Sequence, residues 1–299
     1  MKTMKIFTII ILFLTFNAFS QNSVINVNPV SKNKHVFLDS IYSKHLKQYR
    51  SFYVYLPSKY SKKVKYPVVY TTDGQLLTDS FYFNRMDSLI KNKIIKPFIM
   101  ICVFSNEKKV ENDNLQYRNY EYLKSMSYSK LIDNKNLYHA HLKFYSQELI
   151  KYTQEKYSIS NKFDERYIFG FSNAATFCLS LSFEKPELFG KIILPSMYSS
   201  EYDIDKFINS KNSIILSGTY FFSYGTKEHN EISSIKKLEY QKHIKCVITR
   251  FKGGHDPEKW ADELLSILKI NLKPYSVFEN NFLIKKNQYN YIHIINIIQ

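Results

Sequence analysis

The stretch RYIFGFSNAATFCLSL, residues Arg166 to Leu181, decides the fold of this chain. An apolar run reaches Gly170, the chain turns around Ser172, and small residues then lead into a second apolar segment. This order predicts a strand, a sharp turn and a helix. In the G-x-S-x-G pattern, the serine of such a turn is exposed above a sheet and acts as a nucleophile. Ala174 replaces the last glycine, but it adds only one methyl group and Ala175 is also small, so we expect Ser172 to remain a nucleophile.

Strand-like and helix-like segments alternate around this stretch over about 200 residues, which predicts an α/β domain with a mostly parallel sheet. The first two strands read as an antiparallel pair, whereas later ones are nearly continuous apolar runs, as in strands buried on both faces. Strands are expected at residues 35–42, 49–57, 67–70, 97–104, 166–170, 190–196, 220–225 and 245–251. Helices are expected at about 80–92, 136–157, from 173 onward, 231–243 and 256–272.

The domain organisation follows from the two ends of the chain. Residues 1–20 carry two lysines, an apolar run and the small-residue pattern Ala18-Phe19-Ser20, which predict a secretory signal peptide. A membrane anchor is the alternative, but the apolar run is too short to span a bilayer comfortably. We therefore expect export to the periplasm or the medium, with no stable membrane insertion after cleavage. One domain is expected at 21–273, and 274–299 forms either an extra strand or a loosely ordered tail.

The formal charge of +16 raises the question of an anionic partner. The basic residues are scattered, only five are arginine, and no nucleic-acid motif is present, so we expect solvated lysines and no nucleic-acid partner. The three cysteines, Cys102, Cys178 and Cys246, lie in apolar runs without metal-ligand spacing. This placement predicts simple packing, with neither a metal site nor a disulfide framework.

A serine nucleophile needs a base and an acid, which follow it in the order Ser, Asp/Glu, His in the α/β-hydrolase arrangement. His255 follows the strand expected at 245–251 and a Gly-Gly turn, so it is the candidate base. Glu228 follows the strand expected at 220–225 and is the candidate acid. Glu231 is the alternative, although it would open the helix expected at 231–243, where a carboxylate favourably meets the helix dipole.

The oxyanion of the reaction needs two N–H donors. One is expected at Asn173, the residue after the nucleophile, and the other in the loop after an earlier strand. That loop is TTDGQ, residues 71–75, in which Gly74 lets the backbone approach a substrate closely. The second donor is therefore expected at Gly74 or Gln75.

Several segments together resemble the Putative esterase family of α/β-hydrolases, which includes enterochelin (ferric-siderophore) esterases, S-formylglutathione hydrolases and certain acyl-sugar esterases. The resemblance runs from about Arg50 to Leu268. The segments that carry it are YRSFYVYLPSKYSKKVKYPVVYTTDGQ, YRNYEY, RYIFGFSNAATFCLSLSFEKPELFGKIILPS, YGTKE and FKGGHDPEKW.

The resemblance implies an αβα sandwich without a cofactor, in which Ser172 is the nucleophile, His255 the base and Glu228 the acid. It also places an R-x-x-E-Y segment, Arg118 to Tyr122, near the mouth of the active site, in a role that the sequence leaves undefined. The sequence thus predicts an exported carboxylic-ester hydrolase that acts on a small-molecule ester, either a siderophore ester or an acylated saccharide. The alternative is a non-catalytic protein that keeps the hydrolase shell and binds a siderophore or a glycan.

Overall fold

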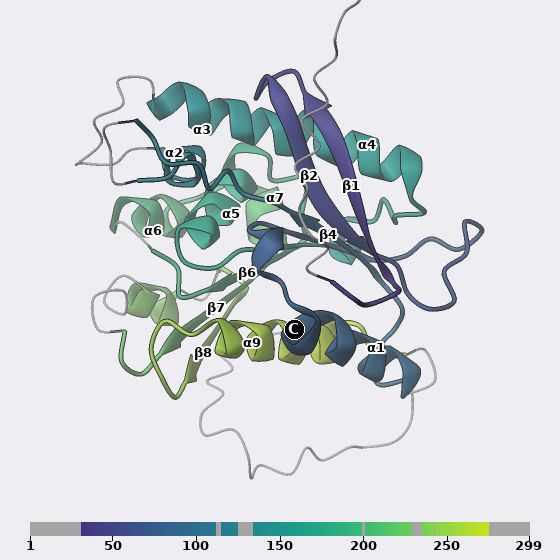
Figure 1. The fold of residues 1–299 in the computed structure, drawn as a ribbon. Coiled ribbons are helices and arrows are strands. Elements are labelled where there is room, and N and C mark those ends of the chain that lie inside the picture. Colours follow the sequence, from purple (N-terminus) through teal and green to yellow (C-terminus); the bar gives the residue numbers. More distant parts are fainter. Residues whose placement is uncertain are drawn as a thin grey trace, which may run out of the picture.

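The structure is a computed structural model that describes residues 31–111, 115–124, 134–198, 201–228, 235–241 and 243–274. The predicted signal peptide at 1–20, the alternative acid Glu231 and the C-terminal extension beyond Pro274 lie outside the described residues. The described residues form one eight-stranded sheet with helices on both faces (Figure 1).

The sheet has the order β1-β2-β4-β3-β5-β6-β7-β8. β1 pairs antiparallel with β2 and β2 antiparallel with β4, while every other neighbouring pair is parallel. This confirms the predicted mostly parallel sheet with antiparallel N-terminal strands. The strands are β1 Val36–Ser43, β2 Gln48–Tyr55, β3 Val68–Thr71, β4 Ile99–Val103, β5 Arg166–Phe169, β6 Lys191–Pro195, β7 Thr219–Gly225 and β8 Cys246–Phe251.

The central strands are apolar throughout because helices cover both faces of the sheet. All residues of β3 and β4 are buried, since side chains that alternate between the two faces meet a hydrophobic layer on either side. One core cluster includes Tyr138, Phe177 and Ile204, and the other includes Met86 and Trp260. The sheet therefore separates two hydrophobic cores, as the αβα sandwich predicted from the family resemblance requires.

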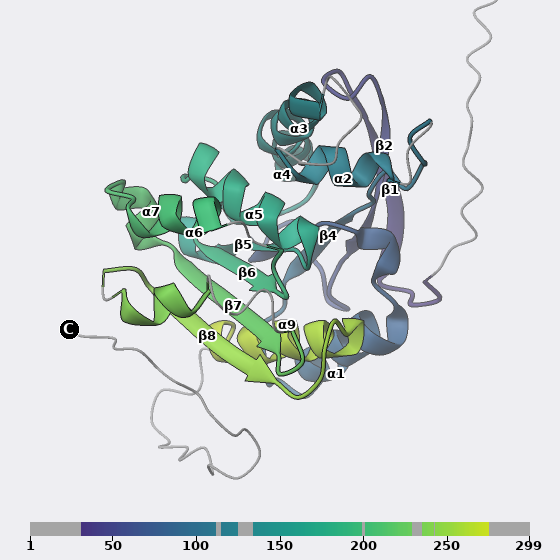
Figure 2. The ribbon, with the colours of Figure 1, turned by 90° about the vertical axis from the view of Figure 1, so that its left-hand side faces the viewer.

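The helices form two layers, which Figure 2 shows from the side. α3, α4, α5 and α6 cover one face, and α1 and α9 cover the other. The α-helices are α1 Asn84–Lys91, α2 Tyr117–Tyr122, α3 Asn134–Lys143, α4 Ile150–Lys156, α5 Asn173–Glu184, α6 Glu201–Ile208, α7 Ser213–Ser217 and α9 Pro257–Asn271. A π-helical segment, Phe144–Leu149, joins α3 to α4, so the helix predicted at 136–157 is confirmed in outline.

The helix predicted at 231–243 is confirmed only in part. Lys237–Tyr240 is a short 3-10 helix, and Gln241 after it has extended backbone angles. Residues 235 and 236 are helical, and Ile235 and Leu238 are both buried in the same core cluster. This helical segment therefore ends at Tyr240, before residue 243.

The direction of the chain through the sheet reverses between β3 and β5. From β3 the chain moves outward to β4, and it then returns to β5 on the other side of β3. In open α/β sheets, ligands bind at such a switch point, outside the carboxyl ends of the strands. The TTDGQ loop follows β3 and Ser172 follows β5, so both lie at this position.

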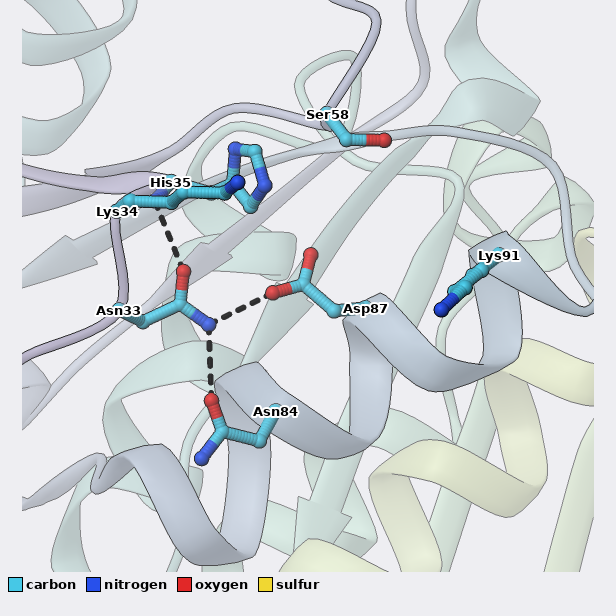
Figure 3. A pocket seen from close by; sticks show the side chains of 7 residues that line it. All are labelled: Asn33, Lys34, His35, Ser58, Asn84, Asp87 and Lys91. Atoms are coloured by element: carbon cyan, nitrogen blue, oxygen red, sulfur yellow. Dashed lines mark hydrogen bonds between the residues drawn. The ribbon is translucent and has the colours of Figure 1, made fainter.

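A pocket of about 430 Å³ lies at the other end of the sheet, where Tyr55 of β2 pairs with Met100 near the start of β4. Figure 3 shows Asn33 donating hydrogen bonds to Asn84 and Asp87 there, at 3.0 and 2.7 Å. The lining residues are Asn33, Lys34, His35, Ser58, Asn84, Asp87 and Lys91. Among the described residues, no helix is long and apolar enough to span a bilayer, and no cluster of three metal-ligating side chains occurs.

Candidate active site

Ser172 occupies a sharp turn between β5 and α5. Its backbone angles are φ 57° and ψ −130°, a conformation that non-glycine residues rarely adopt and that costs on the order of 1–3 kcal/mol. Its N–H donates to the carbonyl of Pro195 at 3.2 Å, and its carbonyl accepts from Tyr198 N–H at 3.3 Å. These bonds to the end of β6 hold the strained turn in place.

The two residues that flank the serine in the sequence pattern have different steric roles. A Cβ atom on Gly170 would lie 2.7 Å from both the Ala174 carbonyl oxygen and Cys178 Sγ, so only glycine fits beneath the helix. Ala174 is fully buried, and its N–H donates to the Phe171 carbonyl at 3.0 Å. Its methyl group is accommodated in the core, and the turn around Ser172 forms despite the missing second glycine.

Glu228 and His255 lie together at the carboxyl ends of β7 and β8. His255 Nδ1 is 2.9 Å from Glu228 Oε1, and the glutamate side chain is only 6% exposed while the histidine side chain is 47% exposed. The loops that follow these two strands are closely packed, because a Cβ on Gly225 would lie 2.5 Å from the Gly253 carbonyl oxygen. Local glycine geometry therefore brings the two loops into contact.

Glu228 is held by further donors on its second oxygen. The Gly225 N–H and the Ser196 hydroxyl both donate to Oε2, the latter at 3.0 Å. Ser196 in turn accepts a hydrogen bond from Trp260 Nε1 at 2.8 Å. The glutamate is therefore held in place: Oε2 accepts hydrogen bonds from Gly225 and Ser196, and Oε1 faces His255.

Trp260 also connects His255 with the serine turn. Its indole stacks on the ring of Phe171, the residue before Ser172, with ring centroids 4.5 Å apart. The His255 ring meets the same indole edge-on at 4.7 Å. One indole thus packs against both His255 and the residue before Ser172, although no hydrogen bond joins Ser172 to His255 in the described part of the chain.

The expected oxyanion donors begin two helices. Asn173 is the first residue of α5, and Gly74 opens a 3-10 helix, Gly74–Leu76, that follows β3. The first N–H groups of a helix have no acceptor within it, so those of Asn173, Gly74 and Gln75 have no helical partner. The TTDGQ loop thus contains a 3-10 turn, and it follows β3, the parallel neighbour of the strand β5 that precedes Ser172.

Sequence reasoning missed Asp73 and left the R-x-x-E-Y segment without a role. Asp73 is completely buried, and Arg118 binds it with two charge-assisted bonds of 2.6 Å, from Nε and Nη2. The Tyr122 hydroxyl donates to Asp73 Oδ1 at 3.1 Å. The available signal was a pair of donors four residues apart, which lie on the same face of a helix, together with an acid in a Gly-containing loop.

Electrostatics reinforce this cluster. Burial acts to lower the pKa of Arg118, but its hydrogen bonds to Asp73 and the charge of Asp73 raise that pKa above the ordinary value. Burial raises the pKa of Tyr122 well above its ordinary value, and the Asp73 charge adds to the effect. Near neutral pH, Arg118 is therefore a cation and Tyr122 a neutral donor.

A family model matches most of the chain. The model of the family described as Putative esterase matches residues 43–270 of the chain. The uncharacterized protein YjcH of Bacillus subtilis strain 168 is 26% identical over 208 residues, which are 66% of this chain and 75% of YjcH.

Solved structures share the fold at low identity. The enterobactin esterase FES of Shigella flexneri has a TM-score of 0.62 and 16% identity, covering 79% of this chain and 58% of FES. The ferulic acid esterase AmCE1/Fae1A of the fungus Anaeromyces mucronatus has a TM-score of 0.59 and 17% identity, covering 80% of this chain and 90% of that protein. The BES protein of Bacillus cereus has a TM-score of 0.58 and 16% identity, covering 81% of this chain and 96% of BES. Since the family match extends over most of the chain, this protein belongs to the Putative esterase family of α/β-hydrolases and is a serine esterase.

Proposed function

We propose that this protein is an exported hydrolase of small-molecule carboxylic esters that acts through a Ser172, His255 and Glu228 triad and a covalent acyl-enzyme. The observation that carries the proposal is the Glu228–His255 pair of 2.9 Å at the sheet edge where the strained Ser172 turn lies. The order of the three residues along the chain matches that of α/β-hydrolases.

The first chemical step follows from the environment of each group. Ser172 Oγ attacks the ester carbonyl carbon while His255 Nε2 takes the serine proton. Glu228 accepts a hydrogen bond from Nδ1–H, which keeps the proton on Nδ1 and leaves Nε2 free as the base; its negative charge then stabilises the imidazolium. The carbonyl electron pair moves to the oxygen, and the Asn173 N–H and the N–H of Gly74 or Gln75 donate hydrogen bonds to the resulting oxyanion.

Collapse of this tetrahedral intermediate breaks the bond to the alcohol. The imidazolium of His255 gives its proton to the leaving alcohol oxygen, and the acyl group remains on Ser172. A water molecule then attacks the acyl carbon with His255 again as the base, which releases the carboxylic acid and restores the Ser172 hydroxyl. No cofactor takes part in the proposed cycle.

The substrate class is proposed from the named ligands of the structural neighbours. The Shigella flexneri enzyme was solved with enterobactin and with 2,3-di-hydroxy-N-benzoyl-serine, and the Anaeromyces mucronatus enzyme with ferulic acid. These ligands share a phenolic ring. We therefore propose for this chain either a siderophore ester or an acylated saccharide, with a phenolic ring near the scissile bond.

Export is proposed from the sequence of residues 1–20, which has the charged start, apolar run and small-residue end of a signal peptide. Such a signal places the enzyme in the periplasm or outside the cell. That location suits substrates such as ferric siderophores and acylated plant or surface saccharides. Mass spectrometry of the N-terminus of secreted protein tests this point, because cleavage near Ser20 is expected.

The decisive test of the chemistry compares wild-type protein with Ser172→Ala on p-nitrophenyl butyrate. Loss of the nucleophile should lower kcat by several orders of magnitude. A fluorophosphonate probe should label the folded wild type and not the variant, because only an activated serine reacts. Equal turnover by both proteins would contradict the triad. Absence of both turnover and labelling would favour the alternative, a binding protein that keeps the hydrolase shell.

A substrate panel then separates the two proposed classes. Ferric catecholate siderophores, feruloylated sugars and acetylated sugars are offered to wild-type protein, and Ser172→Ala corrects for spontaneous hydrolysis. The phenolic substrates should have kcat/KM values at least about tenfold above those of acetylated sugars, since one buried aromatic ring contributes more than 1.4 kcal/mol of binding. A preference for acetylated sugars would contradict the role of a phenolic ring.

A further inference from the structure

The buried carboxylate of Asp73 lies directly before the expected oxyanion donors. Its backbone is in the left-handed region, with φ 51° and ψ 38°, and the residue has no solvent exposure. A buried charge is costly unless it is paired and hydrogen-bonded. Arg118 supplies a bidentate pair, and the Tyr122 hydroxyl supplies a third donor. Both donors belong to α2, so one short helix satisfies this carboxylate.

The same turn is anchored on its other sides. A Cβ on Gly74 would lie 2.1 Å from the Cys102 carbonyl oxygen, so the turn is pressed against the end of β4. The Gln75 side-chain carbonyl accepts from Ser105 N–H at 3.0 Å. The Tyr145 hydroxyl donates to the Thr71 carbonyl at 3.0 Å. The backbone around the expected oxyanion donors is therefore held by contacts with β4, with the loop after β4 and with the π-helical segment Phe144–Leu149.

Helix α2 is itself held in place. The Arg118 N–H donates to the Asn106 carbonyl at 2.8 Å, which ties the helix to the loop after β4. Glu121 forms a 2.7 Å ion pair with Arg50 of β2, with side chains 1% and 4% exposed. The Arg118 guanidinium also lies over the Tyr122 ring, 4.9 Å from its centroid. The helix can thus act as a fixed support for the turn.

The charge of Asp73 has a consequence for catalysis. A carboxylate one or two residues from the oxyanion donors would repel the negative charge that develops on the substrate oxygen. A neighbouring guanidinium cancels this field, and in a water-poor site such a charge has a large effect. Arg118 therefore has two physical roles at this turn: it fixes the backbone donors, and it neutralises the charge beside them.

We propose that Arg118 and Tyr122 are positioning residues for the oxyanion hole, acting through Asp73 on the N–H groups of Gly74 and Gln75. The proposal rests on the proposed ester hydrolysis and extends it to the R-x-x-E-Y segment. These residues do not touch the substrate in this proposal. Their effect should therefore appear in the stabilisation of the transition state rather than in the binding of the ester.

The test uses Arg118→Gln, Arg118→Lys and Tyr122→Phe in the full chain with p-nitrophenyl butyrate. Arg118→Gln should lower kcat by about 10- to 100-fold, somewhat less than the loss of a complete oxyanion donor, with KM changed less than about twofold. Arg118→Lys should recover part of the loss because it restores the charge but not the bidentate geometry. Tyr122→Phe, which keeps the ring, should lower kcat by only about two- to fivefold, since it removes one neutral donor.

Butylboronic acid gives a readout that a purely structural role would not move. It forms a tetrahedral anion on the serine, so its inhibition constant should rise by the same factor by which kcat falls in each variant. Arg85→Gln is the matched control, because Arg85 forms an ion pair of the same length, 2.6 Å, with Asp262. That pair lies at the surface: the Arg85 side chain is 39% exposed and the Asp262 side chain 41%. This variant should keep wild-type kcat and boronate affinity.

The possible outcomes separate this inference from the proposed function. A wild type that neither hydrolyses the ester nor reacts with fluorophosphonate would overturn the proposed function and this inference with it. An active wild type whose Arg118→Gln and Tyr122→Phe variants keep kcat and boronate affinity would overturn the inference alone. A rise in KM without loss of kcat would also overturn it, since it would mean that Arg118 binds substrate directly. If Arg118→Gln does not fold, Tyr122→Phe and Arg118→Lys decide.

Discussion

Replacing Glu228 with glutamine changes one oxygen to an amide nitrogen at the centre of the candidate triad. In the structure, both carboxylate oxygens accept hydrogen bonds: Oε1 faces His255 Nδ1, and Oε2 faces Gly225 N–H and the Ser196 hydroxyl. Glutamine has only one acceptor oxygen. It cannot satisfy both sides, so the substitution forces a choice between two arrangements.

Each arrangement has a calculable effect. If the amide oxygen keeps Gly225 and Ser196, the NH₂ group donates to His255 Nδ1, which places the proton on Nε2 and removes the base. If the oxygen faces His255, the NH₂ group meets the Gly225 N–H, and a buried donor is left unsatisfied at a cost of about 1–3 kcal/mol. The first arrangement avoids this cost, so we expect the wrong tautomer to dominate.

The expected loss is large but incomplete. An Asp-to-Asn change in a Ser-His-Asp triad lowers kcat by about 10⁴ through the same tautomer effect. The His255 side chain is 47% exposed and so has room to rotate away from the amide, which restores some activity. We therefore expect Glu228→Gln to lower kcat by at least about tenfold and by up to about 10⁴.

The assay is steady-state hydrolysis of p-nitrophenyl butyrate, with thermal denaturation to confirm the fold. Glu258→Gln is the matched control, since it removes a carboxylate three residues from His255 in the first turn of α9, and it should keep wild-type kcat. Glu231→Gln should cost only a few tenths to about 1 kcal/mol of stability. Loss of kcat in Glu231→Gln with unchanged kcat in Glu228→Gln would refute the assignment of the acid.

Three further perturbations test the surroundings of the site. Gly74→Ala should lower kcat at least about tenfold because its methyl would displace the oxyanion turn from Cys102; unchanged kinetics would contradict the close approach. Trp260→Phe should lower the unfolding free energy by about 1–3 kcal/mol, measured by urea denaturation, because Ser196 loses its indole donor; an unchanged midpoint and slope would contradict this. His141 is buried, and desolvation holds its pKa well below 6.5, so the unfolded state alone gains a proton as pH falls. Between about pH 7.5 and 5.5, wild type should therefore lose about 1.4 kcal/mol more stability than His141→Phe; equal losses would show that His141 ionises in the fold.

The sequence alone determined the order of the eight strands along the chain and the position of the serine turn, whereas the short helices α2, α6 and α7 were not predicted. The runs at 67–70 and 97–104 are apolar throughout, and the run at 166–170 is apolar after Arg166; such runs form strands only where both sheet faces are covered. The requirement for glycine at Gly170 is also local, because the helix after the turn crosses directly over that position. Neighbouring residues and periodicity are sufficient for these conclusions, since each depends on contacts within a single strand-turn-helix unit.

Only the tertiary structure decided which distant side chains meet. The sequence offered Glu228 and Glu231 as acids, and the structure puts Glu228 against His255 by packing Gly225 onto Gly253. It also joins Asp73 to Arg118, 45 residues further along the chain, in a pair that no periodic pattern encodes. The segment predicted as a helix to residue 243 ends at Tyr240 in the structure. Side-chain pairing across a sheet edge depends on strand order and on the close approach of separate loops, and these are fixed only when the whole sheet has assembled.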